Sequence, residues 1–387
     1  MRGRRLKLAK FALLTFLNYI AFAFAQSFLV TRLSDLGYSP GERGMIIAFG
    51  ALFTVLGQFF IGYLCDKLQT NKKVFIVIRI ISAIIAWAFY TFGDLGLGIV
   101  VLSVLGFTST GQMMISVMDS WVLESDEFFV NNFGLVRVFG SFGWMLTTYV
   151  IGSIIDNYGY AMVGNLILLF STIVVIYSCF IQDSNKINAG REIKLSDIKI
   201  ILQDKKFILV VAILAFANLS VSSETYVIIE KMMQLGASNS EIGFKWAYQA
   251  ALELPMFFMV GYILKRKGYR KILPLVLVLY GIRWVLYGLA NSTEQIIWIT
   301  TMQLITFPFL QVCMKVLVSE VAPKHLFTTS QTLAASIYIG FVTFLSPLLT
   351  GVMMDALGLN NTIYIIGAIM IIPLVLFFKF LKLQEVN

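Results

Sequence analysis

Charged side chains are scarce in this sequence: of 387 residues only 13% are Asp, Glu, Lys or Arg, about half the share usual in a soluble chain. Hydrophobic residues make up 58%, and the mean hydropathy is +0.83. Apolar runs such as 46–64 are long enough to cross a bilayer as a helix. They lack the alternation of polar and apolar residues that barrel strands require. The composition therefore predicts an all-α integral membrane protein.

Cysteine and histidine are nearly absent. Cys65, Cys179 and Cys313 lie within or beside apolar runs, which indicates free thiols that pack as small apolar residues. The single histidine, His325, is predicted to be a solvated loop residue rather than a proton carrier. No His or Cys residues stand at metal-ligand spacing, so neither a metal nor a cofactor is expected.

Apolar runs bounded by charge, glycine and turn residues predict twelve membrane-spanning helices. They cover residues 9–31, 43–65, 74–92, 96–123, 134–155, 161–182, 207–230, 241–264, 272–290, 295–318, 328–354 and 362–378. The basic and then apolar start of the chain would also suit a secretory signal peptide. Its removal, however, would leave eleven spans and break the repeat described below.

Lys and Arg residues are distributed unevenly between the two sides of these spans. The two tails and the loops after even-numbered spans hold 22 of them, and the opposite loops hold three. The positive-inside bias then predicts a protein of the cytoplasmic (inner) membrane with both termini in the cytoplasm. The net charge of +9 is explained without nucleic acid, because the basic side is expected to meet anionic lipid headgroups.

The sequence also repeats itself with an offset of 199 residues. Three matches carry the repeat: Leu36-Gly-Tyr-Ser-Pro-Gly-Glu-Arg-Gly44 with Leu235-Gly-Ala-Ser-Asn-Ser-Glu-Ile-Gly243, Gly62-Tyr-Leu with Gly261-Tyr-Ile, and Gly152-x-x-x-Asp156-x-x-Gly159 with Gly351-x-x-x-Asp355-x-x-Gly358. Such self-similarity predicts two parallel six-helix halves. We expect bundles at 1–182 and 206–387, joined by a cytoplasmic linker at 183–205.

The loop between the second and third spans resembles a motif of the major facilitator superfamily, G-x-L-x-D-R/K-x-G-R-K/R. Here it reads Gly62-Tyr-Leu-Cys-Asp66-Lys67-Leu, with Gln69 in the place of the second glycine and Lys72-Lys73 after it. The resemblance implies a transporter that works by alternating access, with a cytoplasmic gate at Gly62, Asp66, Lys67 and Lys73. In that gate Asp66 would contact helix ends of the other half.

The fourth and fifth spans resemble the lactose permease type of proton symporter more closely. Asp119 is followed by Phe133-Gly-Leu-Val-Arg137-Val-Phe-Gly-Ser-Phe-Gly-Trp144, and phenylpropionate and nucleoside carriers share this frame. The resemblance implies that Asp119 accepts hydrogen bonds from a solute, that Arg137 pairs with Asp119 and donates to the solute, and that Trp144 stacks on it. Gln249 stands where that type has its sugar-binding Glu.

The second half departs from that type, since Gln303 and Thr306 occupy the positions of its coupling His and Glu. Independently of any family, charges at bilayer depth are tolerated when they face water or one another. Lys245 and Lys315 lie close enough to helix ends to snorkel, and Arg79 stands only one turn into its helix.

Glu253 is the predicted coupling group. It lies near the middle of its span, two residues before Pro255. Burial disfavours a charged carboxylate, so this side chain could bind a proton near neutral pH, and approach of Arg283 would expel it. Two alternatives stay open: a permanent Glu253–Arg283 ion pair that only fixes two helices, or a solute-binding role for Glu253. Glu224 lies in a polar cluster of the seventh span and is the second coupling candidate.

These features together predict a monomeric proton-coupled symporter that imports a small polar or amphiphilic solute, such as a sugar, glycoside, nucleoside or aromatic acid. Proton-driven efflux and a membrane sensor that binds without transport remain as alternatives. An enzyme is not expected, because the acidic loop 124–127 has no metal-spaced partners. No G-x-x-x-x-G-K-S/T string is present, so the chain itself does not use ATP.

Overall fold

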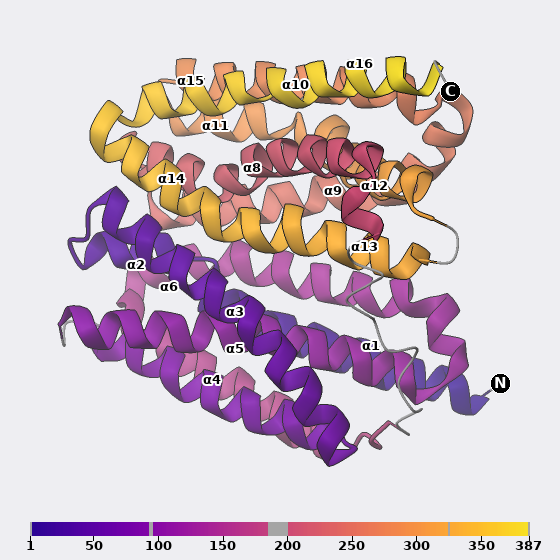
Figure 1. Ribbon diagram of the computed structural model, residues 1–387. Helices are drawn as coiled ribbons and strands as arrows, with labels where there is room; N and C mark the ends of the chain where they lie inside the picture. Colours follow the sequence, from indigo (N-terminus) through magenta and orange to yellow (C-terminus); the bar gives the residue numbers. More distant parts are fainter. Residues whose placement is uncertain (1, 93–95, 185–199, 324–325, 386–387) are drawn as a thin grey trace. The chain divides into compact units, whose positions relative to one another are not determined.

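The computed structural model describes residues 2–92, 96–184, 200–323 and 326–385, which are helical with connecting turns and contain no strand (Figure 1). Eleven described stretches are long and apolar enough to cross a membrane. The longest, 132–179, has 48 residues and is interrupted by the non-helical backbone of Gly159. A span needs only about 20 residues, so this stretch contains two spans. The twelve-span helical fold predicted from the sequence is confirmed. Residues 185–199 of the expected linker, and His325, lie outside the described residues.

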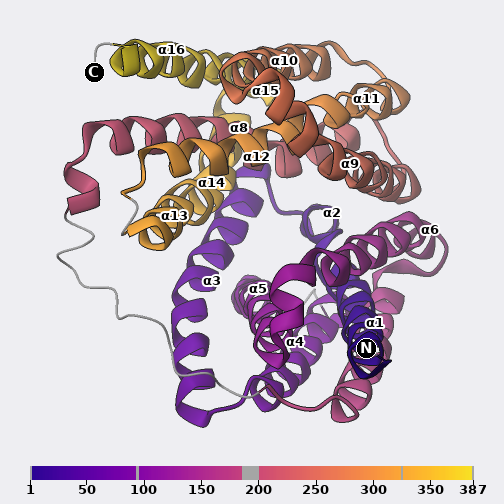
Figure 2. The same cartoon turned by 90° about the vertical axis from the view of Figure 1, so that its right-hand side faces the viewer.

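Six helices cover the described residues of the first half of the chain. They are α1 (Arg2–Gln26), α2 (Leu29–Asp35), α3 (Pro40–Leu68), α4 (Lys72–Phe92), α5 (Leu97–Ser125) and α6 (Glu127–Cys179). The first predicted span is divided between α1 and α2 at Ser27, whose hydroxyl donates to the Ala23 carbonyl at 2.7 Å. Figure 2 shows α1, α4, α5 and α6 nearly end on.

The second half is more interrupted than the sequence predicts. It contains α8 (Lys205–Gln234), α9 (Asn239–Lys267), α10 (Tyr269–Leu289), α11 (Thr293–Thr300), α12 (Gln303–Val321), α13 (Phe327–Ala335), the π-helix η2 (Ser336–Phe341), α14 (Val342–Leu357), α15 (Leu359–Ile369) and α16 (Ile371–Glu385). One continuous helix was expected for each of the tenth, eleventh and twelfth spans. Breaks near 301, at η2 and at Met370 divide them.

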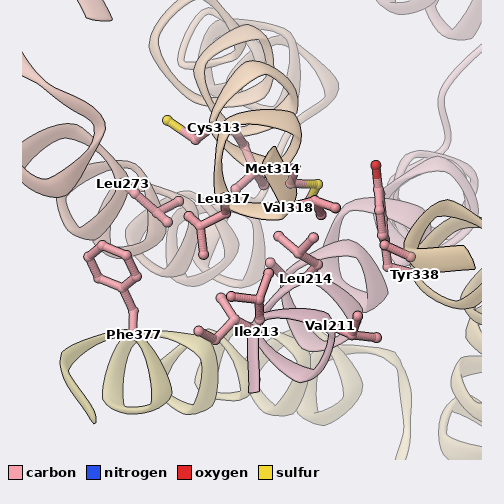
Figure 3. Packing of buried hydrophobic residues seen from close by; sticks show 14 of the residues in the cluster. Val211, Ile213, Leu214, Leu273, Cys313, Met314, Leu317, Val318, Tyr338 and Phe377 are labelled. Carbon is pink, nitrogen blue, oxygen red and sulfur yellow. The ribbon is translucent and has the colours of Figure 1, made fainter. Parts of the chain in front are cut away.

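Contacts group the chain into two compact units. The first comprises Met1–Tyr38, Phe49–Asn188 and Ala237–Ala250, and the second comprises Ser39–Ala48, Ala189–Gly236 and Ala251–Asn387. In the first unit Phe11 packs edge-on against Trp121 and Phe129. In the second, side chains of α8, α10, α12 and α16 interdigitate, among them Leu214, Met314 and Phe377 (Figure 3). The predicted division into six-helix halves stays a prediction.

The 199-residue repeat preserves two helix starts. Ser39 and Glu42 form a capping box at the start of α3: the Ser39 N–H donates to Glu42 Oε2 at 2.8 Å, and the Glu42 N–H donates to Ser39 Oγ at 3.3 Å. Ser238 and Glu241 repeat this arrangement at the start of α9, at 2.8 Å and 3.2 Å. Each box satisfies backbone donors that a helix N-terminus leaves without partners.

A second repeated element, an aspartate from another helix, also caps these two helix starts. Asp156 of α6, three residues before the break at Gly159, accepts hydrogen bonds from the N–H groups of Asn239 at 3.2 Å and Ser240 at 2.9 Å. Asp355, its repeat partner in α14, accepts one from the Gly41 N–H at 3.0 Å. A carboxylate at a helix N-terminus also interacts favourably with the helix dipole. The two repeated motifs therefore bind each other in space within each unit.

Steric constraints explain why glycine stands at these repeated positions. Gly159 and Gly358 have φ angles of +74° and +82°, a region that L side chains rarely adopt. Gly44 and Gly243 lie where helices approach closely. A Cβ on Gly44 would stand 2.2 Å from the Pro347 carbonyl oxygen, and one on Gly243 would meet another carbonyl oxygen at 2.4 Å.

Candidate functional site

A partly exposed ion pair lies in the first unit. Arg137 of α6 donates from Nη1 to Oδ1 of Asp119 on α5 at 3.3 Å, and their side chains are 42% and 28% exposed. The Arg137 guanidinium also lies 4.9 Å from the ring centre of Tyr19 on α1, in cation–π contact. The structure thus brings together the two charged residues predicted for solute binding, and it adds an aromatic contact from Tyr19.

The glycines of the Phe-Gly string explain how α6 reaches α1. A Cβ on Gly140 would lie 2.8 Å from the Tyr19 ring, and one on Gly143 would lie 2.6 Å from the Phe16 carbonyl oxygen. Because these positions carry no side chain, Trp144 can pack against Phe22, with ring centres 5.7 Å apart. The string therefore presents Arg137 and the half-buried Trp144 from one closely packed helix face.

Gln249 of α9 belongs to the same unit and accepts a hydrogen bond from Lys245 Nζ at 2.8 Å. Lys245 is fully buried and lies 4.0 Å from the ring centre of Trp246. The expectation that Lys245 snorkels to a helix end is wrong, because its ammonium finds partners along its own helix. Arg79 is also buried, at 3% exposure, whereas Lys315 is exposed.

A buried ion pair lies in the second unit. Arg283 of α10 donates from Nη2 to Glu224 of α8, and the two side chains are 0% and 5% exposed. Tyr287 donates to the other Glu224 oxygen at 3.2 Å. The ring of Tyr280 covers the guanidinium at 4.5 Å. Removing either charged partner would leave the other buried and unpaired, which is costly.

Gln303 of α12 connects this pair to Glu253 of α9. An arginine only donates hydrogen bonds, so the Gln303 oxygen must face Arg283, and the amide nitrogen then donates to Glu253 Oε1 at 2.6 Å. Thr306 accepts a second bond from Arg283 Nη1 at 2.7 Å. Glu224, Arg283, Gln303 and Glu253 therefore form one continuous polar chain, which we call the coupling network.

The sequence predicts coupling roles for Glu224, Glu253 and Arg283, but none for Gln303, which links them. A signal was present, because Gln303 and Thr306 lie three residues apart on one face of an apolar helix. They also occupy the positions where the lactose permease type carries its coupling groups. Because both residues are uncharged, neither was predicted to take part in coupling.

The four residues of the predicted gate motif, Gly62, Asp66, Lys67 and Lys73, are all exposed. Gln69, which replaces the motif glycine, has a positive φ of 52° and donates from Nε2 to the Asp66 carbonyl at 2.6 Å. The motif glycine thus corresponds to a left-handed helix end. Contact of Asp66 with the other half stays a prediction.

The fold is that of secondary membrane transporters. Two solved structures of the nucleoside transporter NupG are similar to this chain, with TM-scores of 0.82 and 0.83, 14% and 13% identity, and coverage of 97% of this chain and 99% of theirs. A D-xylose–proton symporter gives a TM-score of 0.72 at 12% identity, covering 96% of this chain and 97% of its own. At such identities the likeness shows the fold alone.

The model of the MFS_1 like family matches residues 8–366, so the chain belongs to that family. The putative nucleoside transporter YegT of Escherichia coli K12 is 26% identical over 340 residues, covering 84% of this chain and 79% of YegT. A lactose permease of Citrobacter freundii is 23% identical over 357 residues, covering 86% and 83%. A probable 3-phenylpropionic acid transporter of E. coli K12 is 18% identical over 305 residues, covering 77% and 78%.

These findings confirm the predicted superfamily and its lactose and phenylpropionate permease relatives. The protein is a multi-pass secondary transporter of a small molecule and not an enzyme.

Proposed function

We propose that this transporter is a monomeric proton-coupled symporter of the cytoplasmic membrane, with both termini in the cytoplasm, that imports a small polar or amphiphilic solute by alternating access. The observation that supports coupling is the network itself: a carboxylate at membrane depth, Glu253, joined through one neutral amide to a buried Arg283–Glu224 pair.

The two carboxylates of the network have different environments. Glu224 accepts from Arg283 and from Tyr287 and is almost inaccessible, so it is the acidic partner of the buried arginine. Glu253 is only partly buried and accepts a hydrogen bond from the Gln303 amide, so it is the carboxylate of the network that a proton can reach. Glu253 is therefore the proton carrier in this proposal, and Glu224 holds Arg283 in place.

Gln303 can transmit the protonation state. Hydrogen bonds to a charged acceptor are roughly twice as strong as those to a neutral one, so proton binding at Glu253 weakens the bond from Gln303 Nε2. The amide oxygen of the same side chain holds Arg283. A change at Glu253 then alters the contacts of Arg283 without any charge moving between helices.

Solute recognition is assigned to the Asp119–Arg137 pair together with Trp144 and Gln249. Asp119 accepts from solute hydroxyls, Arg137 donates to solute oxygens, and the indole of Trp144 packs on an apolar ring face. The names of the relatives, a nucleoside transporter, a lactose permease and a phenylpropionic acid transporter, all describe solutes that combine polar groups with an apolar face. A thermal-shift screen of the purified protein against sugars, nucleosides and aromatic acids would identify the class.

Glu253→Gln tests the coupling. In right-side-out vesicles with an imposed inward proton gradient, the variant should lose uphill accumulation of the solute found in that screen and keep counterflow exchange, because exchange needs no net proton movement. Glu320→Gln is a matched control, since that carboxylate bonds Arg270 at the surface of the same unit.

Unchanged accumulation in Glu253→Gln would show that the coupling carboxylate lies elsewhere. Uptake by inside-out vesicles only would favour efflux. Binding without flux in either orientation would favour a sensor.

A further inference from the structure

A cavity of about 390 Å³ lies at one end of the first unit, where α1 begins and where α5 and α6 end. Lys7 and Lys10 of α1 line one side, and residues 180–183, which follow α6, line the other. Neither lysine has a hydrogen bond or an ion pair with another described residue. This cavity takes no part in the transport mechanism proposed above.

The acidic residue in the lining, Asp183, is already engaged. It accepts hydrogen bonds from the Thr70 hydroxyl and from the backbone N–H groups of Asn71 at 3.2 Å and Lys72 at 3.0 Å, where it caps α4. A carboxylate with this many donors on its two oxygens does not need a lysine to balance it. The two lysine charges of the cavity are therefore available to a ligand.

The carbonyl groups at the end of α6 are also engaged. Lys72 Nζ donates to the carbonyls of Cys179 at 2.9 Å and Ile181 at 2.7 Å, and Trp121 Nε1 donates to the Gln182 carbonyl at 3.0 Å. These donors offset the negative end of the helix dipole. An anion can then approach Lys7 and Lys10 without meeting unpaired acceptors.

The rim of the cavity is apolar and open. Leu6 and Phe180 line it and are 60% and 71% exposed. Phe11 forms its inner wall and is buried against Trp121, with ring centres 5.8 Å apart. At the end of a membrane-spanning bundle, exposed apolar side chains face lipid chains, and a basic pocket between helices suits an anionic headgroup.

We propose that this cavity binds an anionic phospholipid, with its phosphodiester on Lys7 and Lys10 and its acyl chains along Leu6 and Phe180. The apolar rim is the reason to choose a lipid over inorganic phosphate, which would gain nothing from it. The site anchors the N-terminal helix to the ends of α5 and α6.

The test compares lipid binding by two double variants in detergent solution. Lys7→Gln/Lys10→Gln removes the proposed contacts. Lys379→Gln/Lys382→Gln removes two exposed lysines with the same spacing on α16. Phosphatidylglycerol, phosphatidylcholine and inorganic phosphate are titrated against each protein, with thermal unfolding and native mass spectrometry as readouts.

The first variant should bind phosphatidylglycerol about twenty-five-fold more weakly than the wild type, since each of the two lysines near an anionic lipid contributes a factor of about five. The control should match the wild type, and Lys7→Arg/Lys10→Arg should retain binding. Equal affinity in all variants would overturn the site. Protection by inorganic phosphate that matches protection by the lipid would overturn the choice of ligand.

Discussion

At the residue scale, the partly exposed Asp119–Arg137 pair proposed to bind the solute is expected to contribute little to folding. Ion pairs with this much solvent contact are worth about 0–1 kcal/mol. The fold therefore does not depend on them, and both groups keep hydrogen-bonding capacity for a ligand.

Asp119→Asn and Arg137→Ala should each abolish solute binding while lowering the melting temperature only slightly. Isothermal titration of the purified variants with the solute from the thermal-shift screen measures the first effect, and thermal unfolding measures the second. Arg32→Ala is a useful control, because it removes an arginine of the same unit that bonds Asp35 at 2.6 Å. Intact affinity in Arg137→Ala would remove this pair from the site.

Gln69 carries a local strain that its family motif avoids. Its positive φ costs about 1 kcal/mol or more for a side chain other than glycine, and its hydrogen bond to the Asp66 carbonyl recovers part of this. Gln69→Gly should raise the melting temperature. Gln69→Ala should lower it, because that variant keeps the strain and loses the bond. A glycine variant no more stable than the alanine variant would refute this account.

At the scale of elements, the repeated sequence motifs are matched helix starts and their caps. The capping boxes at Ser39 and Ser238 could be read from the sequence, since Ser-x-x-Glu precedes an apolar run in both halves. That Asp156 caps α9 and Asp355 caps α3 could not be read, because residues far apart in the sequence meet only when the helices pack.

Asp156→Asn and Asp355→Asn should each destabilise the protein by about 1 kcal/mol, because each removes a charge from a helix N-terminus. Thermal unfolding in detergent is the measurement. Asp35→Asn should have a smaller effect, since Asp35 is 52% exposed and pairs within its own short helix. If Asp35→Asn destabilised the protein as much as the other two variants, the loss of stability could not be attributed to helix capping.

Helix interiors were less predictable than helix starts. The span at 328–354 was expected as one helix, and the structure inserts the π-helix Ser336–Phe341 between α13 and α14. No pattern of proline or glycine predicts a π-helix, which arises where one extra residue is accommodated in a helical turn. By contrast, the break inside α6 could be predicted from Gly159.

At the scale of the whole molecule, twelve spans require the two termini to lie on the same side of the membrane. The distribution of Lys and Arg predicts that this side is the cytoplasm. Labelling with a membrane-impermeant maleimide tests this. A cysteine appended after Asn387 should react in inside-out vesicles only, and Asn291→Cys, in the turn between α10 and α11, should react in right-side-out vesicles only.

Cys65 and Cys313 are buried, so the maleimide should label neither of them in either vesicle type. Cys179 is exposed, and the Cys179→Ser background removes its labelling. Labelling of both introduced cysteines from the same side would contradict an odd number of spans between them. Labelling of the appended cysteine from outside would reverse the proposed orientation.

The sequence by itself determined that the chain lies in a membrane, how many times it crosses, where the repeated helices start and which residues could hold a charge there. These properties follow from local composition and from spacing along one helix. Only the tertiary structure decided which charges meet: Arg283 with Glu224, Gln303 between Arg283 and Glu253, and Lys245 inside rather than at a surface. The physical reason is that successive side chains project about 100° apart around a helix axis. Which side chains meet therefore depends on the rotation of each packed helix about its own axis, and this rotation is set by the packing of the helices.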